Sequence, residues 1–97
     1  MTPPQFTWDE GKAASNLTKH GVSFDRIAAF AFETALTVQD TRLNYGETRW
    51  RSLGNIDGRV HAAVYAWRGG AIRLISLRKA NAREVQHYEQ YRRSRSA

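Results

Sequence analysis

The sequence contains no cysteine, so neither a disulfide framework nor a thiolate metal site can form. It also lacks any apolar run that approaches the roughly 18 residues needed by a membrane-spanning helix. Residues 1–8, MTPPQFTW, contain no apolar segment of the kind found in signal peptides. These absences argue against a disulfide-rich secreted protein and against a membrane protein, and we expect a protein of the reducing cytoplasm.

Acidic residues are scarce in the second half of the chain. Residues 49–97 contain three Asp or Glu against eleven Lys or Arg, whereas residues 1–48 contain six acids against four cations. Twelve of the fifteen cations are Arg, whose planar guanidinium suits phosphate and carboxylate groups. The chain has 97 residues and a net charge of +6, and it is long enough for one domain. We expect an anionic partner, first a phosphate-bearing molecule and alternatively an acidic protein.

Two helices are predicted near the start of the chain. The first covers residues 8–20, with either Thr7 or Asp9 as its N-cap, and ends at Gly21. The second, FDRIAAFAF, covers residues 24–32 and follows so closely that the two helices must form a tight corner.

Three antiparallel strands are predicted next, joined by two tight turns. The turn dipeptides are Asp57-Gly58 and Gly69-Gly70, and both favour two-residue hairpins. The strands that flank these turns cover residues 48–56, 59–68 and 71–79.

Weaker signals surround this hairpin region. Residues 34–39 alternate only weakly between apolar and polar types. A final helix is expected to open at Asn81, with Glu84 at its third position. Residues 1–5 and 92–97 are expected to form loose tails around a single domain.

If both hairpins are regular, the pairing of the strands follows from counting. His61 then lies opposite Gly54 on one side and opposite Arg78 on the other, all on one face of the sheet. Lys79 points to the opposite face. A single β-bulge would exchange the two faces of one strand.

Four stretches of the chain together resemble the BrnT family of type II toxins. The most specific is WDEGKAASNLTKHGVSF (8–24), in which a Trp-Asp-x-x-Lys helix leads into Lys-His-Gly-Val-x-Phe. The resemblance continues through GETRWRSLG (46–54), WRGGAIRLISLRKA (67–80) and the segment 84–88. The family usually has Ser-Ala-Arg-Arg-Ala where this chain has residues 76–80, SLRKA, so one Arg is replaced by Lys.

The resemblance implies a fold, an activity and a partner. The fold class is α+β and RelE-like: two N-terminal helices, a small antiparallel sheet of about four strands and a C-terminal helix. Members of the family act as ribonucleases that arrest translation. For this chain we expect cleavage of RNA without a metal ion and without a cofactor. Their partner is a BrnA-type antitoxin, whose ribbon-helix-helix part binds operator DNA.

Cleavage of RNA without a metal needs a base near the 2′-hydroxyl, a proton donor for the 5′-oxygen, and cations around the phosphate. Arg78 is the leading candidate for phosphate stabilisation, with Lys79 beside it. His61 is a candidate base because a neighbouring guanidinium favours the neutral imidazole, and Glu47 is the rival base. Residues expected to bind RNA are Arg49, Arg73, Lys19 and His20.

Structural roles compete with each of these functional ones. Lys19 and His20 also suit the C-terminal end of a helix, where the dipole favours cations. His61 could equally be a buried strand residue. The chain as a whole could be a non-catalytic module that uses the same basic surface to bind nucleic acid or a partner.

Overall fold

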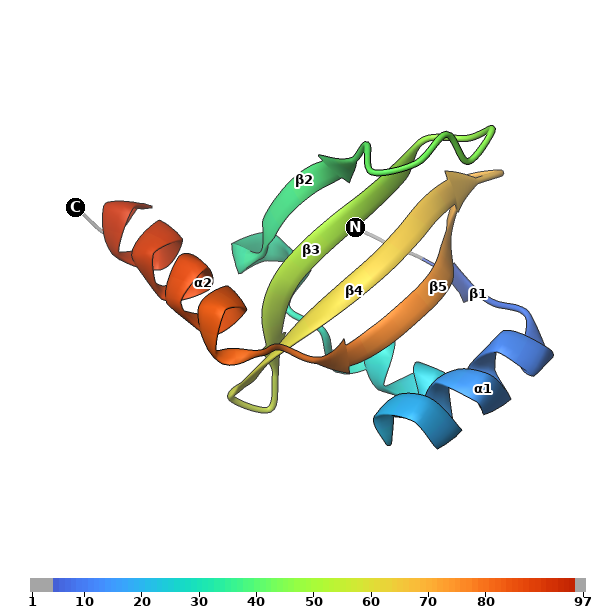
Figure 1. The fold of residues 1–97 in the computed structure, drawn as a ribbon, viewed down its shortest axis with the longest axis horizontal. Helices are drawn as coiled ribbons and strands as arrows, with labels where there is room; N and C mark the ends of the chain where they lie inside the picture. Colours follow the sequence, from blue (N-terminus) through green and yellow to red (C-terminus); the bar gives the residue numbers. More distant parts are fainter. Residues whose placement is uncertain (1–4, 96–97) are drawn as a thin grey trace.

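The computed structural model describes residues 5–95 and is built around three long antiparallel strands (Figure 1). These are β3 (Arg49–Ile56), β4 (Arg59–Arg68) and β5 (Ala71–Lys79), which confirms the three predicted strands. Both connecting turns have positive φ at their two central residues, as a hairpin turn that matches the sheet twist requires.

Two further strands complete a five-stranded sheet in the order β1-β5-β4-β3-β2. β2 (Leu36–Asp40) pairs antiparallel with β3, whereas β1 (Phe6–Thr7) pairs parallel with β5. The α+β class is therefore confirmed, but a purely antiparallel sheet of about four strands is wrong. β1 has two residues, too few for an alternating pattern to reveal it in the sequence.

The first predicted helix is confirmed as α1 (Glu10–His20). Its N-cap is Asp9, whose side chain accepts a hydrogen bond of 2.9 Å from the Lys12 amide. Thr7 belongs to β1, so the alternative cap is wrong. The helix ends at Gly21, which adopts a left-handed conformation and donates its amide to Leu17.

The second predicted α-helix is wrong, because this segment forms two short 3₁₀ helices, η1 (Phe24–Ala29) and η2 (Phe32–Thr34). Phe24, Ile27 and Phe30 are all buried. Their spacing of exactly three residues matches the three-residue turn of a 3₁₀ helix rather than the 3.6 of an α-helix.

The main core lies on one side of the sheet, which we call the core face. Side chains from β4 and β5, including Tyr65, Leu74 and Leu77, pack there against the aromatic and aliphatic residues of the 3₁₀ segment. The fully buried members show how tightly this side is closed: Phe24, Ile27, Ile56, Ile72, Leu74 and Leu77.

Asn16 ties α1 to the free edge of β5. β1 covers this edge only opposite Ile72 and Arg73. Farther along β5, the buried Asn16 side chain takes the place of a strand: it donates to the Leu77 carbonyl at 2.7 Å and accepts from the Leu77 amide at 3.2 Å. It also donates to the Val22 carbonyl at 3.0 Å, which fixes the chain after α1.

The other side of the sheet, the open face, is covered at one end by α2 (Ala82–Arg95) (Figure 1). The helix begins after Asn81 as predicted, and Asn81 and Glu84 exchange two hydrogen bonds of 2.9 Å. Tyr88 anchors it in a small second cluster.

The predicted loose tails need partial correction. Residues 92–95 form the last turn of α2, and the Gln5 carbonyl accepts a hydrogen bond of 2.8 Å from Ile72. Residues 1–4 and 96–97 lie outside the described part of the chain. Within residues 5–95, neither α1 nor α2 has the length and apolar character needed to span a bilayer.

Candidate active site

A β-bulge changes which residues of β5 share a face. Tyr65 pairs with Leu74, but its neighbour Val64 pairs with Ser76, so β5 contains one extra residue at Ile75. Arg78 therefore lies opposite Ala62, and Lys79 lies opposite His61. The predicted pairing of Arg78 with His61 is wrong, and the faces assigned to Arg78 and Lys79 are exchanged.

His61 lies on the core face, away from Arg78. Its side chain is 6% exposed, and Gly54 is its partner on β3, as predicted. Nδ1 lies 2.8 Å from the Arg59 carbonyl oxygen, which can only accept, so this nitrogen carries the proton. Burial, helped by the charges of Arg59 and Lys79, lowers the pKa of His61 and favours the neutral ring.

Arg78 lies on the open face in a two-pronged ion pair with Glu84. The two guanidinium nitrogens approach the two carboxylate oxygens at 2.8 and 2.9 Å. This contact lowers the pKa of Glu84, and the amide of Asn81 contributes in the same direction, so the carboxylate is ionised. Arg78 remains about one-third exposed and can reach a further anion.

An open-face groove runs beside this ion pair and encloses about 220 Å³. Its floor is mostly apolar and comes from β2, β3 and β4, where Leu36, Leu53 and Ala62 lie in one row with Arg78. Its polar lining comes from the β2–β3 loop, from β3, from β5 and from α2: Arg42, Arg51, Arg78, Glu84 and His87.

The three arginines of the groove form one positive region. The charge of Arg42 opposes that of Arg78, and the charge of Arg51 contributes to the lowered pKa of Glu84. Three guanidinium groups against the two carboxylates of Glu84 and Asp40, which pair with Arg78 and Arg42, leave one net positive charge at the groove, which favours an anionic ligand.

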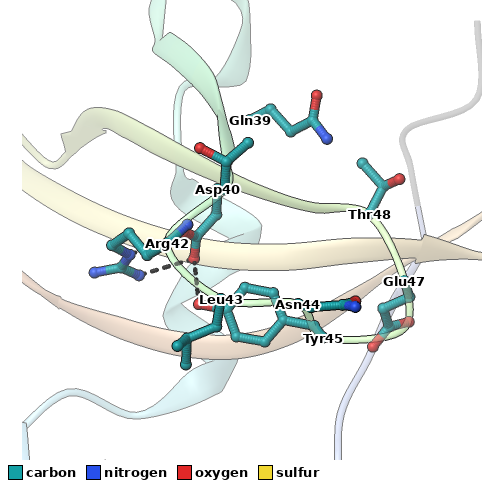
Figure 2. Close-up of a pocket in the computed structure, with 9 residues that line it drawn as sticks. Gln39, Asp40, Arg42, Leu43, Asn44, Tyr45, Glu47 and Thr48 are labelled. Atoms are coloured by element: carbon teal, nitrogen blue, oxygen red, sulfur yellow. Dashed lines mark hydrogen bonds and ion pairs between the residues drawn. The ribbon is translucent and has the colours of Figure 1, made fainter.

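The loop 41–48, between β2 and β3, is held by Asp40 (Figure 2). The buried Asp40 carboxylate accepts two hydrogen bonds of 2.8 Å from the Arg42 guanidinium and one of 3.1 Å from the Tyr45 hydroxyl. Arg49 stacks over the Tyr45 ring at 4.0 Å. The loop surrounds a shallow hollow, and its fixed shape directs Arg42 toward the open-face groove.

Glu47 lies at the far end of this loop from Arg42 (Figure 2). Its carboxylate accepts hydrogen bonds of 3.0 and 2.7 Å from Arg68, and Arg49 lies 3.7 Å away. The Arg68 contact lowers the pKa of Glu47, so this carboxylate is ionised. Glu47 does not line the open-face groove, and the structure does not bring it together with Arg78.

The remaining predicted cations are spread over several parts of the molecule. Arg73 pairs with Ala66 of β4 and with Thr7 of β1. Arg49 lies beside the loop, and its Nε is buried without a hydrogen-bond partner among residues 5–95. Lys79 is exposed at the end of β5.

Lys19 and His20 line a second depression, which we call the α1 hollow. It encloses about 250 Å³ between α1 and β5. Burial, Lys19 and Arg78, in that order, lower the pKa of His20. The residues around the hollow are Lys12, Ser15, Asn16, Lys19, His20, Ile75 and Ser76.

Sequence reasoning missed Arg42, Arg51, Glu84 and His87 as parts of one site. Arg51 and Leu53 share one face of β3 because they are two residues apart, but the bulge in β5 hid the relation of Arg51 to Arg78. His87 follows Glu84 by three residues, a spacing that puts both on one side of a helix. Among residues 5–95, no three His, Asp or Glu side chains are grouped so as to bind a metal ion.

Comparisons with known proteins assign the chain to a family. The family model described as the ribonuclease toxin BrnT of type II toxin-antitoxin systems matches residues 8–84. The crystal structure of the ribonuclease toxin BrnT from Brucella abortus matches with a TM-score of 0.65 and 26% identity, over 81% of this chain and 99% of that chain. No curated protein sequence matches. Because the family model spans most of the chain, this protein belongs to the BrnT family of ribonuclease toxins of type II toxin-antitoxin systems.

Proposed function

We propose that this protein cleaves single-stranded RNA in the open-face groove without a metal ion. One observation carries the proposal: a single groove is lined by Arg42, Arg51 and Arg78 together with His87. The chain belongs to a ribonuclease family. Guanidinium groups neutralise the charge that develops on phosphorus during cleavage, which is the task that a metal ion performs in other nucleases.

The groove supplies a base and cations for the reaction, and solvent supplies the acid. The 2′-oxygen attacks phosphorus, the bond to the 5′-oxygen breaks, and the products are a 2′,3′-cyclic phosphate and a 5′-hydroxyl. His87 is exposed and lines the groove, so its imidazole can take the proton of the 2′-hydroxyl. The groove is open to solvent, and water can give a proton to the leaving oxygen.

Arg78 keeps the central role that the sequence predicted, as the cation at the scissile phosphate. Glu84 acts as a positioning residue, because its two-pronged contact fixes the plane of the guanidinium. Catalytic roles for Glu47, His61 and Lys79 stay predictions, and so do RNA-binding roles for Arg49, Arg73, Lys19 and His20. The position of His61 on the core face makes His87 the better base.

The test is cleavage of a labelled single-stranded RNA in the presence of EDTA. We expect Arg78→Ala to lower kcat/KM by about 100-fold or more, and Arg83→Ala, an exposed cation next to Glu84, to change it little. We expect His87→Gln to cost about 100-fold and His61→Gln only a few-fold. If His61→Gln loses most of its kcat/KM while His87→Gln stays active, the base is His61 on the core face and not His87.

A non-catalytic module is the second candidate, favoured by the fact that Glu84 already neutralises Arg78. In that case the protein binds RNA but never cuts it, with or without ribosomes. This result would contradict the cleavage proposal, while circular dichroism of the same samples verifies that they are folded.

We further infer that the protein arrests translation in the cytoplasm and is neutralised by a BrnA-like ribbon-helix-helix antitoxin. Operator DNA is contacted only through that antitoxin. The inference and the RelE-like character of the fold rest on the family resemblance. Induction of this chain alone is expected to stop growth, and co-induction of the neighbouring gene is expected to restore it. Normal growth after induction alone would contradict toxicity.

A further inference from the structure

The α1 hollow concentrates positive charge outside the open-face groove. Lys12, Ser15 and Lys19 follow one another at spacings of three and four residues, so they share one side of α1. Ser76 faces them from β5, and His20 closes the end of the hollow. The lining includes two hydroxyl groups and three basic side chains but no acidic residue.

The dipole of α1 accounts for two of the three basic side chains of the hollow but not for the third. Lys19 and His20 suit the C-terminal end of α1, but Lys12 lies in its first turn, where the helix dipole disfavours a cation. Within residues 5–95, neither Lys12 nor Lys19 forms an ion pair, whereas several arginines are paired with acids: Arg26, Arg42, Arg68 and Arg78. Lys12 contributes to the lowered pKa of Glu47, but the two side chains form no ion pair within residues 5–95, so the hollow keeps charge available for an outside anion.

The α1 hollow and the open-face groove lie on either side of the end of β5. Ser76 lines the hollow, and Arg78, two residues later, lines the groove. The two regions are close enough for the charge of Arg78 to affect His20. β1 ends its pairing with β5 at Arg73, so no strand blocks the way from one region to the other.

We propose that the α1 hollow binds a backbone phosphate of the same RNA strand whose scissile phosphate lies at Arg78. This inference rests on the proposed cleavage site in the groove. Lys12 and Lys19 supply the charge, and the hydroxyls of Ser15 and Ser76 donate hydrogen bonds to phosphate oxygens. The RNA strand crosses the edge of the sheet where Asn16, rather than a strand, covers β5.

The first test is the salt dependence of binding. The probe is a single-stranded RNA of about 12 nucleotides whose 2′-oxygens are all methylated, so that it cannot be cleaved. Each phosphate contact that is lost lowers the slope of log K against log salt by about 0.7. We expect this reduction, with several-fold weaker binding, for Lys12→Gln and for Lys19→Gln.

Arg92→Gln is the matched control, because Arg92 is an exposed cation on α2, away from α1 (Figure 1). It removes one positive charge without touching the hollow, and its slope should remain that of the unaltered protein. If Lys12→Gln and Lys19→Gln behave like Arg92→Gln, the hollow does not bind RNA and the inference is overturned. Lys12 and Lys19 are exposed, so both variants should retain the fold.

The second test identifies the phosphate. Each phosphate of the probe is replaced in turn by a neutral methylphosphonate. In the unaltered protein, we expect one position next to the groove to weaken binding, and in Lys19→Gln the same replacement should cost clearly less, because only Lys12 still supplies charge to that phosphate. Equal costs in both proteins would overturn the inference. Because the probe cannot be cut, this test measures binding separately from cleavage. If the coupling is observed but ordinary RNA is not cleaved, the proposed cleavage site is wrong and the phosphate-binding inference still holds.

Discussion

A single asparagine joins three parts of the fold. The amide group of Asn16 contacts the carbonyl of Val22 and both backbone groups of Leu77, which are 61 residues away in the sequence. The side chain is buried, so these backbone groups have no access to water if it is removed. Each buried polar group left without a partner costs about 1–3 kcal/mol.

We expect Asn16→Ala to lower the free energy of unfolding by about 2–4 kcal/mol, because it leaves three buried backbone groups without a hydrogen-bond partner and creates a void. Urea unfolding followed by circular dichroism measures this change. Asn44→Ala is the control: Asn44 is exposed and accepts one bond from the Gly46 amide, so the expected loss is below about 1 kcal/mol. Equal losses in the two variants would show that Asn16 contributes nothing special.

Asp40, which holds the loop 41–48, makes the stability of the protein depend on pH. Its hydrogen bonds with Arg42, the largest cause, and with Tyr45 hold its pKa well below the ordinary value of 3.8. A group with a lowered folded-state pKa stabilises the protein above its unfolded-state pKa, and this stabilisation is lost as the pH falls.

We therefore expect the free energy of unfolding to fall as the pH decreases below about 4. Asp40→Asn should be less stable at neutral pH and should show a shallower decline over the same range. Urea unfolding at a series of pH values measures both slopes. Parallel curves for the two proteins would show that Asp40 does not cause the loss of stability at low pH. The control is Asp57→Asn, because Asp57 is an exposed acid paired with Arg26.

At the level of elements, the hairpins could be predicted and the bulge could not. The dipeptides Asp57-Gly58 and Gly69-Gly70 predict the two turns, because glycine readily adopts the positive φ that such turns need. Ile75 carries no comparable signal: it is an apolar β-branched residue within an apolar strand, and the extra residue is set by packing. That one residue decided the face of Arg78, and with it the composition of the site.

The groove depends on elements far apart in the sequence. Arg42 comes from a loop, Arg51 from β3 and His87 from α2. The sequence predicts the strand and the helix separately, but not the direction in which α2 leaves the sheet. The capping pair of Asn81 and Glu84 starts the helix, and the contact of Glu84 with Arg78 holds its first turn against the end of the sheet.

Gly54 permits the close contact between β3 and the segment after η1. A Cβ atom at this position would lie 2.7 and 2.8 Å from ring atoms of Phe30 and 3.3 Å from the Ala35 Cβ. These distances are too short for carbon atoms, so a side chain here forces Phe30 to move within the main core.

We expect Gly54→Ala to lower the free energy of unfolding by about 1–3 kcal/mol. Phe30→Leu should be less harmful in the Gly54→Ala background than alone, because the smaller side chain leaves room for the methyl group. Chemical denaturation of the four proteins gives the coupling energy. Additive losses would contradict the contact. Gly11→Ala is the control: a Cβ there would lie 3.2 Å from the exposed Asp9 carboxylate and away from the main core, so the expected loss is smaller than for Gly54→Ala.

Residues 5–95, taken together, form two apolar clusters of unequal size. The main core joins the sheet to the α1 and 3₁₀ segments, whereas α2 is held by a small cluster around Val60, Ala80 and Tyr88. Regions with few buried apolar contacts open at a lower free energy than the core. α2 carries two groove residues, so opening of this helix dismantles the proposed site.

We expect the amides of α2 to exchange with deuterium faster than those of β4, although both elements are regular. Tyr88→Ala removes the anchor and should accelerate exchange in α2 by at least about tenfold, while β4 keeps most of its protection. Mass spectrometry of peptides from both elements measures the difference. Uniform acceleration across the molecule would show that the two clusters unfold together.

The two edges of the sheet differ in what they offer to another polypeptide. The β5 edge is closed by β1 and then by Asn16, whose amide uses the backbone groups with which an incoming strand would pair. Within residues 5–95, no strand pairs with the outer edge of β2, and Val38 there is 45% exposed. Growth of the sheet by strand addition is therefore directional. It proceeds from β2, so a charged residue in place of Val38 is the substitution that would best protect a concentrated sample against aggregation.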